Sequence, residues 1–216
     1  MSQNEDIEMK KLLVFLPVVI FLGCNAIINE SFVLKDGETK KGNVFCVNGS
    51  IDIGNDCTVT GGINAVNGGI QVGKNSTVED IQSVNGPIFI DKSSTVRGDV
   101  NAVNGEIQTN DGVSVMGDVS SINGNIILQT TKVARNVETE NGDITLTGLS
   151  VVEKDILIKG KSKLSDAKRR IEIRLEKGAR VLGNIEVEDE KIEVSIFLSS
   201  DSKILGDVVN AEIIYE

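Results

Sequence analysis

The sequence has no histidine and no tryptophan, and only 3% of its residues are aromatic. Without histidine there is no imidazole to act as a general base or to bind a metal. The three cysteines lack the paired spacing of a zinc site, and no glycine-rich phosphate loop precedes a helical pattern. We therefore expect a protein that is not an enzyme, with no cofactor and no metal.

Positive charge is also scarce. Lysine and arginine number 22 against 32 aspartate and glutamate residues, which gives a formal charge of -10 and an isoelectric point near 4.7. Phosphate contacts need clustered basic side chains. We therefore expect no nucleic-acid partner.

What the sequence does have is a repeat. An Asn-Gly step recurs at intervals of 18 or 19 residues, and a fixed period in this range is typical of a solenoid. The asparagines of these steps are Asn48, Asn67, Asn85, Asn104, Asn123 and Asn141.

Two apolar columns frame the repeat. One is the pattern V-x-G-D-V, as in Val96/Val100 and Val115/Val119, and the other is the isoleucine that follows each turn, as in Ile107. β-Branched residues favour pleated, half-buried backbone. The period suits one coil of a parallel β-helix, whose coils stack at roughly 4.8 Å. We predict an all-β, single-stranded parallel β-helix with coils of 18–19 residues.

Antiparallel pairing is the rival interpretation, because Asn-Gly between apolar runs also indicates a β-hairpin. Against it, each repeat contains one Asn-Gly step, whereas a meander needs a turn at both ends of every strand. The one-residue deletions also fall between the columns, where they leave the strand faces unchanged.

The asparagine column allows two structural interpretations. Strict alternation from Val100 points Ala102 and Asn104 inward, yet the column that contains Val103 looks like core. The asparagines are then either an internal hydrogen-bonded ladder or a row of left-handed corner residues. Asp99 and Asp118 form a further corner column, which we expect to satisfy turn backbone rather than to catalyse.

Residues 9–24 read MKKLLVFLPVVIFLGC, with two lysines, a short apolar run and a small residue before Cys24. This is the pattern of a secretory signal, and its apolar run is too short to span a bilayer. The ending IFLGC resembles the lipobox of bacterial lipoproteins, so we expect residues 1–23 to be a signal peptide and Cys24 to be lipidated. Translation could begin at Met9, because the acidic leader before it is unlike a signal.

The remaining chain divides into three parts. Residues 24–43 are expected to be a lipidated tether and an N-terminal cap, residues 44–148 regular coils, and residues 149–216 irregular coils with inserts. A basic insert over 159–174 and an acidic insert over 186–193 could neutralise one another. Alternatively, the basic insert could contact anionic lipid or polysaccharide.

Cys46 and Cys57 remain in a chain that we expect to be exported. They could form a disulfide. They fall in different columns, however, and different columns of one coil can face apart. Two free small residues are the alternative.

The stretches VRGDVNAVNGEI, VMGDVSSINGNI and KGARVLGNIEVEDEKI resemble the bactofilins, over roughly residues 44–210. These are polymer-forming bacterial cytoskeletal proteins built as right-handed β-helices, so the resemblance implies that handedness. The repeats are also similar to those of β-helical envelope lipoproteins and adhesin-like domains. Bactofilins are typically cytoplasmic, so polymerisation inside the cell is not implied for a chain with an export signal.

These features predict a membrane-anchored structural or interaction module of the bacterial cell envelope. The alternative is an adhesin-like surface protein that binds glycan or peptide on one face. The partners expected are the membrane, envelope polysaccharide and a second copy, which would pair tail to tail through the alternating strand at 210–216. Asn25 after Cys24 favours the outer membrane, by resemblance to enterobacterial sorting.

Overall fold

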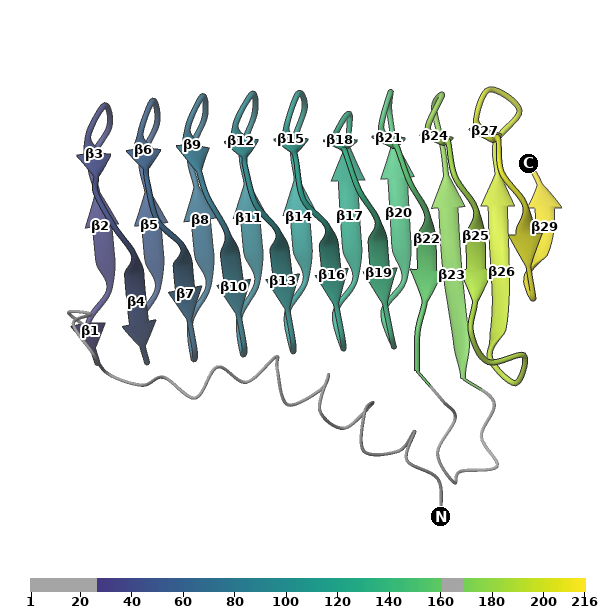
Figure 1. Ribbon diagram of the computed structural model, residues 1–216, viewed down its shortest axis with the longest axis horizontal. Coiled ribbons are helices and arrows are strands. Elements are labelled where there is room, and N and C mark those ends of the chain that lie inside the picture. The colour runs from purple at the N-terminus through teal and green to yellow at the C-terminus, as the bar shows by residue number, and fades with distance from the viewer. Residues whose placement is uncertain (1–26, 161–168) are drawn as a thin grey trace, which may run out of the picture.

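The computed structural model describes residues 27–160 and 169–216. Over these ranges the chain forms a β-solenoid of about ten coils with no helix (Figure 1). All pairings between the described strands are parallel, from β1 against β4 to β26 against β29. The predicted single-stranded parallel β-helix is confirmed, and the antiparallel alternative is wrong.

The coils contribute to three parallel sheets. The strands of the first sheet, in spatial order, are β1 (Ile27–Ile28), β4 (Val44–Val47), β7 (Ile63–Ala65), β10 (Ile81–Ser83), β13 (Val100–Ala102), β16 (Val119–Ser121), β19 (Val137–Thr139), β22 (Ile156–Ile158), β25 (Ile185–Val187) and β28 (Val208–Val209).

The second sheet holds the longest strands. It consists of β2 (Phe32–Leu34), β5 (Ile51–Ile53), β8 (Ile70–Val72), β11 (Ile88–Ile90), β14 (Ile107–Thr109), β17 (Ile126–Gln129), β20 (Ile144–Thr147), β23 (Arg170–Leu175), β26 (Glu193–Leu198) and β29 (Glu212–Tyr215).

The third sheet is narrow, with two residues in each strand. It consists of β3 (Thr39–Lys40), β6 (Thr58–Val59), β9 (Thr77–Val78), β12 (Thr95–Val96), β15 (Ser114–Val115), β18 (Lys132–Val133), β21 (Val151–Val152), β24 (Arg180–Val181) and β27 (Lys203–Ile204).

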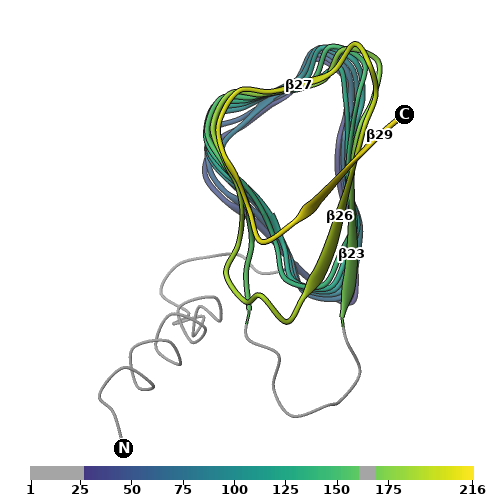
Figure 2. The ribbon, with the colours of Figure 1, turned by 90° about the vertical axis from the view of Figure 1, so that its right-hand side faces the viewer.

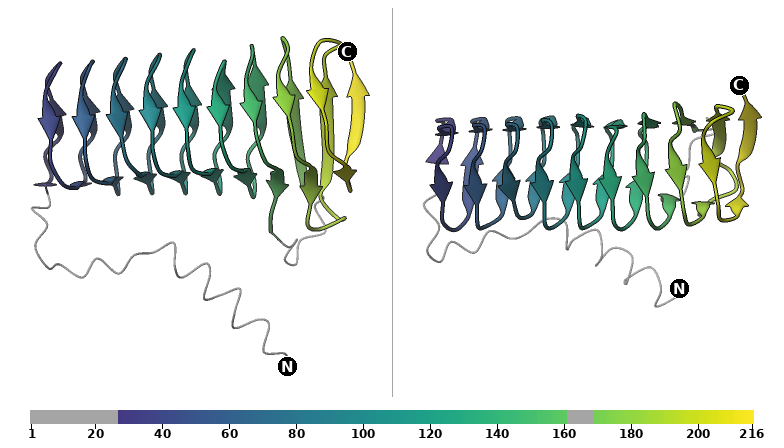
Figure 3. Two further views of the ribbon diagram at one scale, coloured as in Figure 1. Left: turned by 45° about the horizontal axis from the view of Figure 1, so that its top comes forward. Right: turned by 90° about the horizontal axis from the view of Figure 1, so that it is seen from above.

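Seen along the axis, the coils superpose as a three-sided tube (Figure 2). Each Asn-Gly step is the corner between the first and second sheets, along the lower edge in Figure 1. Each Gly-Asp step is the corner between the third sheet and the first. The two views in Figure 3 show the coils stacked in one continuous row.

The core consists of stacked aliphatic ladders. Both predicted columns are buried: Val96, Val100 and Ile107 have no exposed surface, and their equivalents in neighbouring coils are alike. In-register parallel pairing places Ile107 between Ile88 and Ile126. Such ladders bury apolar surface at each coil, which stabilises the stack.

The solenoid begins before the position that the sequence indicates. β1 and β2 pair with β4 and β5, and β3 pairs with β6, so residues 27–40 already form a coil. The stretch expected to be tether and cap therefore contains coil, with β2 (Phe32–Leu34) as one of its strands. The repeat is hard to see here because Asn29 is followed by Glu30 instead of glycine.

The irregular C-terminal coils keep the same three sheets. β23 and β26 are each six residues long and pair along their whole length, with Arg170 opposite Glu193. Part of what the sequence indicates as inserts is thus lengthened strand. The part of the basic insert over 161–168 lies outside the described residues.

Candidate binding face

The corner between the third and first sheets carries a ladder of short polar side chains. The Oδ1 atom of Asp80 accepts a hydrogen bond from the backbone N–H of Asp99 at 3.0 Å, and the Oδ1 atom of Asp99 accepts one from the backbone N–H of Asp118 at 2.9 Å. Asn136 and Asp155 continue the pattern. Each side chain satisfies the turn backbone of the next coil, as the sequence predicted, so this column is structural.

Cys46 and Cys57 are free and buried. Cys57 occupies a column of small hydroxyl residues: its backbone N–H donates to Ser76 Oγ at 3.0 Å, and its Sγ contacts Lys35 O at 3.1 Å. Cys46 lies in the first sheet beside Ala65, and burial raises the pKa of its thiol. Both cysteines therefore act as small core residues, the second of the two alternatives.

The asparagines of the Asn-Gly steps form a continuous ladder of side-chain amides. Each Nδ2 donates to the Oδ1 of the asparagine one coil earlier, at 2.7–2.8 Å, starting with Asn48 on Asn29 and ending with Asn141 on Asn123. The ladder is exposed rather than internal. Within it only Asn29 and Asn48 have positive φ, so the left-handed interpretation holds for two positions alone.

Arg169 closes the ladder at its C-terminal end. Its Nη1 donates to Asn141 Oδ1 at 2.9 Å and its Nη2 to Lys159 O at 3.0 Å. Partial burial lowers the pKa of this guanidinium, and the carboxylates of Glu140 and Asp189 oppose that change. A guanidinium thus stands where the next amide would lie.

The valine column beside the ladder is not core. Val47, Val66, Val84, Val103 and Ile122 are half-buried, while the residue before each of them is buried and the asparagine after it is exposed. The alternation from Val100 therefore continues to Val103, and only Asn104 departs from it at the corner. These β-branched side chains form an outward aliphatic ridge, which Ile28 extends by pairing with Val47.

Three columns on this side of the solenoid form what we call the amide–aliphatic face. It spans β4, β7, β10, β13 and β16 with the corners that follow them, and none of its fifteen residues is charged. They are Phe45, Asn64, Gln82, Asn101 and Ser120; Val47, Val66, Val84, Val103 and Ile122; and Asn48, Asn67, Asn85, Asn104 and Asn123.

The absence of charge on this face is unusual for this chain, of which 25% of the residues are charged. The same columns carry Glu138 and Glu140 one coil further on, where the face ends. The outward column of the second sheet, which runs from Val33 in β2 to Ile214 in β29, does include charge. Asp52 lies in β5, and Arg174 in β23 lies over the Phe197 ring at 4.1 Å. The sequence signal for this face is the lack of charge in three columns over five consecutive coils.

Each amide of the ladder keeps unused hydrogen-bonding capacity. A primary amide has two N–H donors and two acceptor lone pairs. The ladder uses one N–H and one lone pair of each interior asparagine, such as Asn85, which donates to Asn67 and accepts from Asn104. One donor and one acceptor per coil therefore remain for water or for a ligand.

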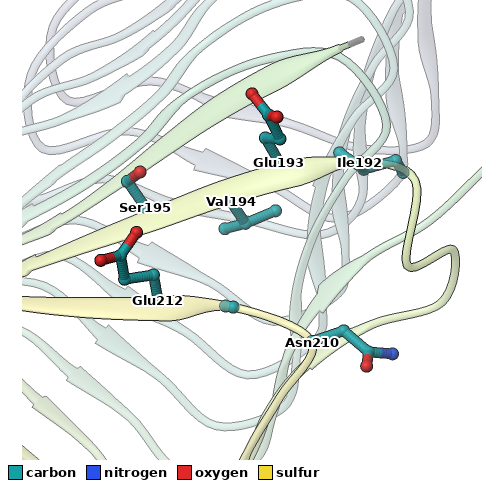
Figure 4. A pocket seen from close by; sticks show the side chains of 7 residues that line it. Ile192, Glu193, Val194, Ser195, Asn210 and Glu212 are labelled. Carbon is teal, nitrogen blue, oxygen red and sulfur yellow. The ribbon is translucent and has the colours of Figure 1, made fainter.

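A shallow depression of about 600 Å³ lies near the other end of the solenoid, between β26 and β29 (Figure 4). It exists because the parallel pairing joins only Ser195–Leu198 with Glu212–Tyr215, which leaves the first two residues of β26, Glu193 and Val194, beyond the start of β29. Val194 and Ile192 line it together with Glu212. Its shape follows from unequal strand lengths.

The described residues contain no group of three or more histidine, cysteine, aspartate or glutamate side chains placed to hold a metal ion. Over the same ranges no helix is long and apolar enough to cross a membrane. Cys24, the predicted lipidation site, lies outside the described residues.

Comparisons with protein-family models, with curated proteins and with solved structures find no match to this chain. Of the bactofilin resemblance, the β-helical repeat architecture is what the structure supports.

Proposed function

We propose that this chain is a lipid-anchored β-solenoid that acts as a structural or interaction module of the bacterial cell envelope, without catalysis. The observation that carries the proposal is the lipobox-like IFLGC sequence, whose Cys24 precedes the first strand at Ile27 by three residues. A lipidated Cys24 would hold a rigid rod directly at the membrane surface. Two or more acyl chains anchor a protein stably, whereas one binds marginally.

Metabolic labelling with radioactive palmitate tests the anchor. The wild-type chain should incorporate label, and Cys24→Ala should abolish it. Cys46→Ser and Cys57→Ser are matched controls, because both residues are buried in the solenoid, and both variants should label like the wild type. Label that persists in Cys24→Ala would refute the anchor.

We place the anchor in the outer membrane, on the basis of Asn25 after Cys24. By resemblance to enterobacterial sorting, aspartate at this position retains a lipoprotein at the inner membrane. Asn25→Asp should then move the protein from the outer-membrane to the inner-membrane fraction of a sucrose gradient. An unchanged distribution would remove Asn25 from the argument.

An adhesin-like binding role is the second candidate. The amide–aliphatic face favours it, because columns without charge that run in register over five coils are suited to an extended neutral ligand. Arrays of glycans and of peptides, probed with the detergent-solubilised protein, separate this role from a purely structural one. Binding to neither class would leave the structural role alone.

Self-association through the C-terminal coil belongs to the same proposal. β29 pairs with β26 on one side and with no other described strand, and Tyr215 is 76% exposed. An edge strand of this kind offers backbone groups to a second copy.

A further inference from the structure

We propose that the amide–aliphatic face binds a neutral, unbranched polysaccharide that lies along the solenoid axis, with about one sugar unit per coil. The inference rests on the proposed role as an interaction module. It adds the face, the class of ligand and the direction in which that ligand lies.

The absence of charge on the face determines which class of ligand can bind. Its fifteen residues carry amides, one hydroxyl, one phenyl ring and an aliphatic ridge, in a chain of net charge -10. An anionic polymer would meet no cation here, and the negative field of the whole molecule would repel it. A neutral ligand pays no such electrostatic penalty.

The chemistry of the columns matches the two surfaces of a sugar. The unused N–H of each ladder amide can donate to one sugar hydroxyl, and its unused lone pair can accept from another. The neighbouring ridge, from Val47 to Ile122, offers half-buried aliphatic surface to the C–H face of a ring. Gln82 and Asn101 add further amides on the far side of the ridge.

The repeat distance favours a sugar over a peptide. Stacked coils advance by roughly 4.8 Å, which is close to the length of one pyranose unit in an extended chain. Alternate units of a β-1,4-linked chain are turned over, so like groups of the sugar recur at every second coil, and each ladder amide can meet either orientation because it keeps both a donor and an acceptor. An extended peptide presents side chains to the same face only about every 6.6 Å and loses register with the ladder within a few coils. The in-register pairing of Ile81 with Ile63 and Val100 keeps the columns straight, so the match extends over five coils.

Single contacts with exposed amides are weak, because water competes for each of them. Affinity should therefore grow with ligand length until the five coils are covered. We expect β-1,4-linked neutral oligosaccharides of five or six units to bind at least about tenfold more tightly than those of two units. Binding should change little between low and high salt, since no charge is neutralised.

The experiment is isothermal titration calorimetry of the full, detergent-solubilised chain with cello- and chito-oligosaccharides of two to six units. Gln82→Glu and Gln71→Glu form a matched pair: each residue is the exposed centre of a three-residue strand with buried neighbours, in β10 and in β8. Gln82→Glu should weaken binding about tenfold, because the ligand must strip water from the new charge. Gln71→Glu, on the second sheet, should leave binding unchanged.

Three results would overturn the inference: no neutral oligosaccharide binds at any length, both variants lose binding equally, or an extended neutral peptide binds instead. None of these results bears on palmitate labelling at Cys24. The proposal of glycan binding on the amide–aliphatic face and the proposal of the membrane anchor can therefore be refuted independently.

Discussion

Individual glycines at the Asn-Gly corners are fixed by the distance between coils. A Cβ at Gly105 would overlap the carbonyl oxygen of Gly86 one coil earlier, and a Cβ at Gly86 would overlap that of Gly68. φ is not positive at these glycines, so the requirement is space rather than a left-handed turn. Backbone of consecutive coils approaches closely here, and any side chain would separate them.

Gly105→Ala should lower the free energy of unfolding by about 1–3 kcal/mol, the usual cost of overpacking. Urea denaturation followed by circular dichroism measures it. Gly62→Ala is the control, because its Cβ would meet nothing closer than Asn64 Nδ2 at 3.5 Å, and it should cost less than about 0.5 kcal/mol. Equal costs at both positions would contradict the packing explanation.

Left-handed backbone is concentrated at a different corner, between the second and third sheets. Asp56, Asn75 and Ser93 have φ of 56°, 56° and 59°, and Gly112 takes the equivalent place one coil later. From the sequence, left-handed residues were one of the two interpretations of the asparagines at the Asn-Gly steps. The pattern that marks them is the polar pair before Ser-Thr-Val or Cys-Thr-Val.

Ser93→Gly should raise the free energy of unfolding by about 0.5–1 kcal/mol, because glycine adopts positive φ without the steric cost that a Cβ brings. Ser114→Gly, in β15, should have the opposite sign and lower it by a similar amount, since glycine in a strand loses entropy on folding. Thermal denaturation of both variants checks the signs. Destabilisation by Ser93→Gly would contradict the assignment of strain.

Among the larger elements, the asparagine ladder has a direction: every Nδ2 donates toward the N-terminal end. Asn104→Asp would place a carboxylate, which only accepts, against Asn85 Oδ1. The variant carboxyl should have a raised pKa in the folded state. Stability should therefore be fully present below the unfolded pKa of about 4 and should be lost as pH rises from that value through the raised pKa of the folded state.

At pH 7 we expect Asn104→Asp to cost about 1 kcal/mol of unfolding free energy, because the site is exposed and water offsets part of the loss. Urea midpoints at pH 7 and pH 3.5 measure this, relative to wild type at each pH. Asn101→Asp in the same coil is the control, since Asn101 Oδ1 accepts from Ser120 Oγ and a carboxylate can do the same. A pH-independent cost at position 104 would contradict a directional ladder.

How far the sequence predicts these elements depends on which columns repeat strictly. The buried columns around Val100 and Ile107 recur in nearly every coil, so the fold and its register follow from them. The first coil was missed because Glu30 replaces glycine. The length of β23 and β26 was missed because charged residues such as Arg170 and Glu193 alternate with aliphatic ones on an outward face.

Only part of the amide–aliphatic face could be predicted from the sequence. The asparagine positions were identified, but their hydrogen bonds run between coils and so depend on spacing that the sequence gives only indirectly. The half-buried ridge resembled core, because β-branched residues fit both core and pleated surface. Its outward direction became clear only from the burial of Ala102 and its equivalents.

At the scale of the whole molecule, charge is distributed unevenly along the axis. Residues 188–216 hold eight carboxylates and two lysines, whereas residues 27–43 hold three of each. The C-terminal coils of two copies would therefore repel each other electrostatically. Their exposed apolar side chains, such as Val209 and Tyr215, favour contact. We expect weak dimers rather than filaments, strengthened by salt.

Ile214→Lys should abolish that association, because Ile214 is central in the edge strand β29. Multi-angle light scattering over a concentration series at low and high salt measures the mass. Ile127→Lys is the control, since Ile127 faces outward in β17 inside the stack, and its mass should match the wild type. A wild-type mass that never exceeds the monomer would contradict the proposal.

Binding along the amide–aliphatic face is tested most directly by a two-dimensional ¹H–¹⁵N spectrum of the side-chain amides during titration with a neutral hexasaccharide. Signals from the ladder asparagines, from Asn67 to Asn123, should shift together and saturate at one ligand concentration, because one ligand covers consecutive coils. The amides of Gln71 and Gln108, on the second sheet, should stay in place. Shifts confined to Gln71 and Gln108, or an unchanged ladder at saturating ligand, would contradict binding along the amide–aliphatic face.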